Sequence, residues 1–172
     1  MRIAVTGSSK LAGAIVERFK ADPVRVEQPL EYQDYDVFIN NAHVGFCQTE
    51  LLEKWFTAWK DDSSKLIINI SSRAALPNLS KGYMYAAQKA SLDHLADNLT
   101  YNSEKQCRIT TINLGMIEDV LPSLKYEEIC DLLQYVISSP KHLEIPRIFF
   151  QHACNYKRIQ KEKEDRYRAS LY

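Results

Sequence analysis

The stretch RIAVTGSSKLAG, residues 2–13, carries the first structural signals of this 172-residue chain. Residues 2–6 are mostly apolar and include β-branched side chains, which predicts a buried strand. A turn with two glycines follows, and from Leu11 to Ala21 the apolar residues have helical spacing. A strand that passes through a glycine turn into a helix is the repeating unit of α/β proteins.

The same alternation recurs along the chain. Further strands are expected at 36–40, 66–70, 108–113 and 145–150, with a weaker one at 24–27, and further helices at 49–60, 83–103 and 126–138. The strands are apolar on both faces, as in a buried parallel sheet. We therefore predict an α/β fold with a Rossmann-like, doubly wound parallel sheet of about six strands. Residues 28–35 are too few for a crossover, which needs at least about 10–12, so one strand-helix unit is reduced or missing.

Length and composition favour one ordinary folded domain. Single domains commonly have about 100–200 residues, and 45% of this chain is apolar. We place the domain at 1–152 and a charged C-terminal tail at 153–172, in which Lys157–Arg168 is mostly charged. We interpret this tail as a solvated helix or frayed end, with a partner-binding arm as the alternative.

The charges and cysteines exclude several classes of partner. Lys plus Arg, 22, equals Asp plus Glu, 22, so no overall field attracts nucleic acid or an anionic membrane. No apolar run approaches the roughly 20 residues that span a membrane. The four cysteines form no C-x-x-C pair, which favours reduced thiols in a cytoplasmic protein. We predict no metal ligands.

Three side chains suggest acid–base chemistry. In YAAQK, residues 85–89, Tyr85 and Lys89 are one helical turn apart and share a face. A cation there stabilises the phenolate, which makes Tyr85 a candidate general acid or base. Ser72 follows a buried strand and is expected at the carboxyl edge of the sheet, where open α/β folds bind ligands. Its hydroxyl is a candidate partner for a substrate carbonyl oxygen.

With these motifs the chain resembles the short-chain dehydrogenase/reductase family over roughly residues 1–152. The matching pieces, in the family's order, are TGSSKLAG at 6–13, NNAH at 40–43, INISS at 68–72, YAAQK at 85–89 and INLGMI at 112–117. The resemblance implies hydride transfer between a nicotinamide cofactor and a small carbonyl or alcohol substrate.

The same resemblance implies roles for individual residues. Ser72, Tyr85 and Lys89 would be catalytic. The cofactor-binding residues would be Gly7, Ser9, Lys10, Leu11 through its backbone, Gly13, Asn41, Tyr85, Lys89 and Ile117. The cofactor would be NADP or NAD, because Lys10 suits a 2′-phosphate and Glu27 a free 2′-hydroxyl; we favour NADPH.

Several positions depart from the family pattern. Leu11, His43 and Leu114 stand where the family has glycine, glycine and proline, and residues 118–125 are short for a substrate-covering lid. An open site with poorly covered substrate would follow. The alternative function is a catalytically idle relative that binds a dinucleotide as a sensor, or an interaction module.

Two further expectations concern the helix predicted at 49–60. The family's proton-relay asparagine is absent near Val44, and Gln48 or Thr49 is the nearest polar replacement. In family members the helix that carries the tyrosine commonly packs against its symmetry mate together with the preceding helix. On that preceding helix Trp55, Phe56 and Trp59 offer large apolar surface, with ordinary core residues as the alternative. We therefore expect a homodimer or homotetramer.

Overall fold

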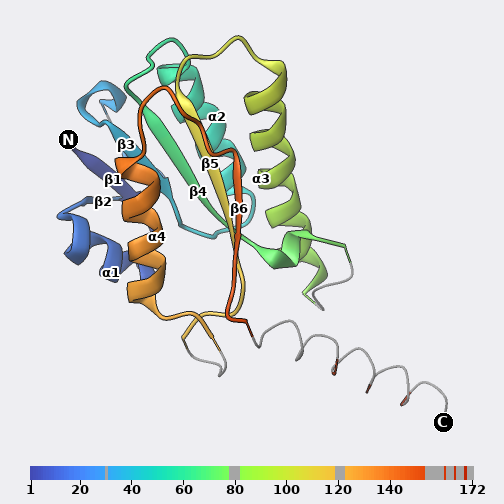
Figure 1. Ribbon diagram of the computed structural model, residues 1–172. Coiled ribbons are helices and arrows are strands. Elements are labelled where there is room, and N and C mark those ends of the chain that lie inside the picture. The colour runs from blue at the N-terminus through green and yellow to red at the C-terminus, as the bar shows by residue number, and fades with distance from the viewer. Residues whose placement is uncertain are drawn as a thin grey trace.

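The protein forms one sheet of six parallel strands with helices on both faces (Figure 1). A computed structural model describes residues 1–29, 31–77, 82–118 and 123–153, together with Lys161, Asp165 and Ala169. The strands are β1 (Ile3–Thr6), β2 (Asp22–Val24), β3 (Val37–Asn40), β4 (Leu66–Ser72), β5 (Arg108–Leu114) and β6 (Arg147–Phe150). The helices are α1 (Lys10–Phe19), α2 (Cys47–Trp59), α3 (Tyr83–Asn102) and α4 (Tyr126–Ser138), with short 3-10 turns η1 (Tyr32–Asp34) and η2 (Arg73–Ala75).

The strand order confirms the predicted doubly wound topology. In the order β2-β1-β3-β4-β5-β6 the chain first moves outward from β1 to β2 and then continues from β3 on the other side of β1. The direction of winding therefore reverses between β1 and β3. The carboxyl ends of these two strands form the crevice where such folds bind ligands.

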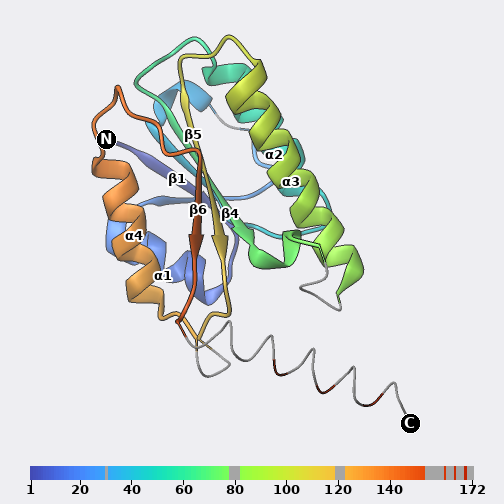
Figure 2. The same cartoon turned by 45° about the vertical axis from the view of Figure 1, so that its right-hand side comes forward.

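Two apolar layers cover the sheet. Helices α1 and α4 lie on one face, where Ile15 and Leu133 pack into the same buried cluster as Ile68 of β4. Helices α2 and α3 cover the opposite face, where Trp55 and Leu92 are buried with Phe38 of β3 (Figures 1 and 2). Because both faces are covered, nearly every residue of the central strands β1, β3, β4 and β5 is buried.

The missing strand-helix unit is also confirmed. Among the described residues between β2 and β3 the chain makes only η1, and β3 pairs directly with β1. Side chains from outside this short link contact it. The Trp59 indole Nε1 donates to the Tyr32 carbonyl at 3.0 Å, and Lys65 Nζ donates to the Tyr35 carbonyl at 2.6 Å. Two backbone carbonyls of the link are therefore satisfied by side chains.

Element boundaries differ from the predictions most at β2. The strand is Asp22–Val24, where we predicted 24–27, because Asp22 and Val24 pair in register with Ala4 and Thr6 of β1. Pro23 is tolerated because β2 is an edge strand and needs hydrogen bonds on one side alone. Helix α2 begins at Cys47, earlier than the predicted 49, and β4 extends to Ser72.

The aromatic residues of α2 are core residues, which corrects the prediction that they offer an interaction surface. Trp55 and Trp59 are both 0% exposed. Trp55 stacks on Phe38 with ring centroids 4.1 Å apart and meets Tyr32 edge-on at 4.8 Å. Both indoles therefore fill the space between α2 and the sheet, and they give no support to a dimer. The oligomeric state stays a prediction.

Two further points concern the limits of the fold. Within the described ranges, no helix is both long and apolar enough to cross a membrane. The tail predicted at 153–172 lies outside the described residues except for Ala153, Lys161, Asp165 and Ala169. Residues 119–122 of the shortened lid at 118–125 also lie outside the described residues. The domain boundary at residue 152 and the nature of the tail stay predictions.

Candidate functional site

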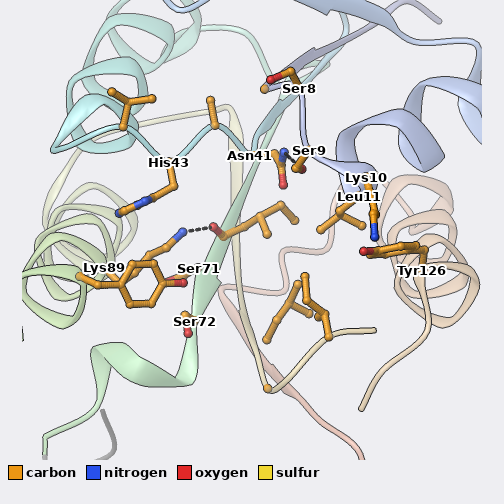
Figure 3. Close-up of a pocket in the computed structure, with 18 residues that line it drawn as sticks. Ser8, Ser9, Lys10, Leu11, Asn41, His43, Ser71, Ser72, Lys89 and Tyr126 are labelled. Carbon is orange, nitrogen blue, oxygen red and sulfur yellow. Dashed lines mark hydrogen bonds between the residues drawn. The ribbon is translucent and has the colours of Figure 1, made fainter. Parts of the chain in front are cut away.

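A cavity of about 620 Å³ opens at the carboxyl edge of the sheet. It is bordered by the β1–α1 turn, the β3–α2 loop, the ends of β4 and β5, and the start of α3. Figure 3 shows His43, Ser72 and Lys89 around one side of this cavity and Lys10, Leu11 and Tyr126 around the other. The lining residues are Gly7, Ser8, Ser9, Lys10, Leu11, Asn41, Ala42, His43, Val44, Ile70, Ser71, Ser72, Tyr85, Lys89, Leu114, Gly115, Ile117 and Tyr126.

The turn after β1 requires glycine at its first position. Gly7 has φ +104°, and a Cβ there would lie 2.9 Å from Asn41 Nδ2 and 3.3 Å from the Ala42 Cα. The neighbouring loop is tied to the same turn, since the Asn41 side-chain amide donates to the Thr6 carbonyl at 3.1 Å. The Thr6 hydroxyl in turn accepts from the backbone N–H groups of Asn41 and Ala42 at 3.0 and 3.1 Å. The two loops at the crevice therefore form one rigid unit.

Helix α1 begins at the wall of the cavity. Ser9 caps it by accepting a hydrogen bond from the Ala12 N–H at 3.2 Å, and the first turn contains no acidic residue. A helix N-terminus without carboxylates favours an anion. Leu11 stands where the family has glycine, and it is 3% exposed because its side chain packs in the core. Leu11 nevertheless lines the cavity. Gly13 differs from the other predicted residues, because it is exposed on α1 and does not line the cavity.

The structure brings the three predicted catalytic residues to this one cavity. Tyr85, on the first turn of α3, is 38% exposed, and Lys89 Nζ lies 5.7 Å from the centre of its ring. Ser72 ends β4, and its hydroxyl oxygen accepts from the Ala74 N–H at 3.1 Å. In that hydrogen bond the Ser72 hydroxyl is the acceptor, so its proton is still available for donation. No other hydrogen bond of this hydroxyl occurs among the described residues. The three side chains can therefore act on one bound molecule.

The Lys89 ammonium is buried, with 4% of the residue exposed. It donates to the Gln48 side-chain carbonyl at 2.6 Å and to the Ile70 backbone carbonyl at 2.9 Å. Burial lowers the pKa of Lys89 to about 8, and the nearby Asp93 and Cys47 oppose that shift. Two of the three ammonium protons are thus held by the protein.

Gln48, one of the two predicted replacements for the relay asparagine, contacts Lys89 directly. Its Nε2 donates to the Asn40 carbonyl at 2.7 Å and to the Ile70 carbonyl at 3.0 Å, which orients the oxygen that Lys89 contacts. Thr49, the other candidate, has its hydroxyl 2.8 Å from that of Ser91. Of the two predicted replacements, Gln48 contacts Lys89 and Thr49 contacts Ser91, while the relay role itself stays a prediction.

His43 lies beside Tyr85 at the mouth of the cavity. Its Nε2 is 2.9 Å from the Gln88 side-chain oxygen, and its ring meets the Tyr85 ring edge-on with centroids 4.8 Å apart. The family's glycine would leave this space open. The histidine therefore holds the Tyr85 ring from one side and narrows the approach to it.

A second cavity of about 740 Å³ lies near the first, and Val44 lines both. Arg25 and Lys54 line the second cavity as cations, and Glu27 and Glu50 line it as carboxylates. Of the two residues predicted to select the cofactor, Glu27 therefore lines the second cavity and Lys10 the first.

Sequence reasoning missed a buried polar network behind the predicted catalytic residues. Asp93 of α3 accepts from the Ser71 hydroxyl at 2.5 Å, from the Asn113 amide at 2.6 Å and from Arg147 Nη1 at 2.7 Å. The position of Asp93, one helical turn after Lys89, was a signal that the sequence contained. Arg147 on β6 carried none, because its contact depends on the pairing of β6 with β5.

Comparison with known proteins identifies the fold. No family model and no curated protein sequence matches the chain. Among solved structures, a serine dehydrogenase from Escherichia coli is 17% identical with a TM-score of 0.68, and the match covers 88% of this chain and 98% of that one. A 3-ketoacyl-(acyl-carrier-protein) reductase from Brucella melitensis, complexed with NADH, is 14% identical with a TM-score of 0.69, covering 88% and 97%.

A third similar structure is a short-chain dehydrogenase from Leptospira borgpetersenii with bound NAD⁺. It is 17% identical with a TM-score of 0.67, and the match covers 86% of this chain and 89% of that one. At these identities the likeness establishes the architecture, and it agrees with the motif order found in the sequence. The chain has the fold of the short-chain dehydrogenases/reductases.

Proposed function

We propose that the chain is a divergent short-chain dehydrogenase/reductase that transfers a hydride between NAD(P) and a small carbonyl or alcohol substrate. The observation that carries this proposal is the meeting of Ser72, Tyr85 and Lys89 at one cavity on the carboxyl edge of the sheet. A bound nicotinamide would supply or accept the hydride. The protein's own groups would hold the substrate oxygen and move its proton.

Each of the three residues has a distinct role in this proposal. Ser72 donates a hydrogen bond from its hydroxyl to the substrate oxygen and so orients the substrate. Tyr85 gives its phenolic proton to that oxygen during reduction and takes it back during oxidation. Lys89 stabilises the phenolate that remains, and its third proton is available to a group in the cavity once Gln48 and Ile70 have taken the other two.

The crevice fits a dinucleotide. Close approach of a pyrophosphate needs a backbone without a Cβ at the turn, and Gly7 satisfies this. We propose Gly7, Ser9, Lys10, Leu11, Asn41 and Ile117 as cofactor-binding residues with Tyr85 and Lys89, all of which line the first cavity. Gly13 is left out of the proposed set because it faces solvent.

We propose NADPH as the preferred cofactor. Arg25 directly follows β2, the strand whose end lies beside the ribose in dinucleotide-binding folds, and it lines the second cavity. A guanidinium binds a 2′-phosphate through parallel, charge-assisted hydrogen bonds. Lys10 at the start of α1 adds a second cation to the same crevice.

One observation favours a second candidate function, dinucleotide binding without turnover. His43 occupies the space beside the Tyr85 ring that a glycine would leave open. If the imidazole keeps the substrate carbon from the reacting position, the protein binds cofactor and acts as a sensor. Cofactor binding and turnover therefore have to be measured separately.

The test follows the absorbance of reduced nicotinamide near about 340 nm with NADPH or NADH and a panel of aldehydes and ketones. Turnover is expected with wild type and its loss with Tyr85→Phe. Tyr83→Phe is the matched control, because Tyr83 lies on the same turn and is 81% exposed. Calorimetric titration with each cofactor separates the candidates. Binding without turnover supports the sensor, and equal rates for wild type and Tyr85→Phe contradict the proposed chemistry.

A further inference from the structure

Asp93 holds two neighbouring elements of the site at once. It lies on α3 one turn after Lys89, and its carboxylate accepts from the Ser71 hydroxyl at 2.5 Å. Lys89 donates to the carbonyl of Ile70, the residue just before Ser71. The ammonium and the carboxylate therefore bind consecutive residues of β4, and Ser71 in turn precedes the catalytic Ser72.

The Asp93 carboxylate is as enclosed as the ammonium, with 8% of the residue exposed. Its other oxygen accepts from Asn113 at 2.6 Å and from Arg147 Nη1 at 2.7 Å. Arg147 also donates to Asp97 at 2.7 Å, one turn further along α3. Charges in a medium of low dielectric act on one another more strongly than in water. The electrostatic potential at Lys89 therefore depends on the charges of both Asp93 and Arg147.

We propose that Asp93 is a positioning residue that keeps the buried Lys89 ammonium charged, and that Arg147 limits the strength of this effect by neutralising part of the Asp93 charge. The catalytic consequence of this inference rests on the proposed function, since Lys89 stabilises the Tyr85 phenolate only while Lys89 itself is protonated. The interaction itself is a property of the folded chain and needs no cofactor.

Among the described residues, no other carboxylate acts on Lys89. Tyr85 shares its helix and faces it through the ring at 5.7 Å. From α2 come the Gln48 amide and the Cys47 thiol, which donates to the Ala42 carbonyl at 3.2 Å and also opposes the lowering of the Lys89 pKa. The β3–α2 loop contributes His43, whose ring meets that of Tyr85 edge-on, and β4 contributes no titratable side chain. Within the described part of the chain, Asp93 is thus the carboxylate through which the field at Lys89 can be altered.

The test measures the pKa of Lys89 directly, by NMR titration of protein labelled at the lysine side chains, with Lys89→Met used to assign the signal. Asp93→Asn is expected to lower the pKa of Lys89 by about one to three units, because the partner charge is lost while Arg147 stays. Arg147→Gln is expected to raise it, because the full Asp93 charge then acts on the ammonium. Asp97→Asn is the matched control, since Asp97 contacts Arg147 but its side chain is 48% exposed.

The pKa of Lys89 is expected to move in opposite directions in Asp93→Asn and Arg147→Gln. A merely structural role would lower the stability of both variants without producing these opposite pKa shifts. No shift in Asp93→Asn, or shifts of the same sign in the two variants, would overturn the inference. If Asp93→Asn does not fold, Arg147→Gln still decides, because a fall or no change contradicts it. The titration uses the free protein, so an absence of turnover would count against the proposed function alone.

In an active enzyme the same variants predict a split in the kinetics. Asp93→Asn is expected to move the alkaline limb of kcat to lower pH by the same interval as the pKa of Lys89, with the KM for the carbonyl substrate little changed. Asp97→Asn is expected to leave the profile in place. A parallel loss of kcat at every pH, without movement of the limb, would indicate a disturbed backbone and contradict the electrostatic account.

Discussion

The buried Lys89 predicts a pH dependence of stability that can be isolated with one variant. Burial lowers the pKa of Lys89 in the folded chain from 10.5 to about 8. In the unfolded chain the ammonium is solvated and keeps its proton more tightly. The unfolded state therefore binds more protons between these two values, and the free energy of unfolding rises with pH across that window. This contribution of Lys89 to the free energy of unfolding is complete above 10.5, the pKa of Lys89 in the unfolded chain, and it is lost as the pH falls through about 8.

The magnitude follows from the two pKa values. With about 1.36 kcal/mol for each unit of difference, the free energy of unfolding should increase by about 2.5 kcal/mol between about pH 7 and about pH 10 through this group alone. Lys89→Met removes the titrating group and keeps a similar apolar length. It leaves Gln48 without its partner, but that cost does not depend on pH. The pH dependence of the difference between wild type and variant therefore reports the titration of Lys89 together with its coupling to Tyr85, Cys47 and Asp93.

The assay is equilibrium urea unfolding of both proteins at several pH values across this range, followed by circular dichroism. Wild type is expected to gain stability relative to Lys89→Met as the pH rises. Titrating groups that do not interact with Lys89 contribute equally to both proteins and cancel. A difference that stays constant with pH would refute the reasoning, since it would mean that Lys89 is solvated in the folded state. A difference that decreases with pH would refute it as well, by reversing the sign.

Three further perturbations follow from single contacts. Trp55→Ala should lower the free energy of unfolding by about 3–5 kcal/mol in urea titrations, because Trp55 is fully buried on Phe38; a loss below about 1 kcal/mol would mean that the space collapses. Gly7→Ala should cost about 1–3 kcal/mol of stability, since its φ of +104° and the 2.9 Å approach to Asn41 Nδ2 both resist a Cβ. Arg25→Gln should weaken NADPH binding about tenfold or more in calorimetric titrations and leave NADH binding unchanged, whereas equal losses for both cofactors would place the guanidinium away from the 2′-phosphate.

The features that the sequence predicted well are those encoded by local spacing. Tyr85 and Lys89 share a helix face because they are one turn apart, and this holds in any helix. Ser72 lies at the sheet edge because a buried strand ends there, and parallel strands end on the same side. The missing unit was predictable by counting residues between strands, since a crossover has a minimum length.

The features that the sequence did not reveal depend on how distant elements pack. Trp55 and Trp59 were expected at the surface because their size suggests an interface, but the helix face that carries them is turned toward Phe38. Arg147 reaches Asp93 only because β6 pairs with β5 on the side of α3. No spacing rule connects residues that far apart in the chain. The replacement for the relay asparagine was left open between Gln48 and Thr49, because the packing of the helix decides which of two adjacent side chains reaches Lys89.

The position of the lost unit explains how a shortened chain keeps this site. In the doubly wound order 3-2-1-4-5-6, the third strand lies at the edge beyond the second. Its absence here leaves β2 as the edge strand and does not touch β4 or α3, which carry Ser72, Tyr85 and Lys89. The trimmed side is instead the one that carries Arg25 and the second cavity. Shortening should therefore alter how the far end of a dinucleotide is held, while the groups that would transfer the proton keep the support of the central strands.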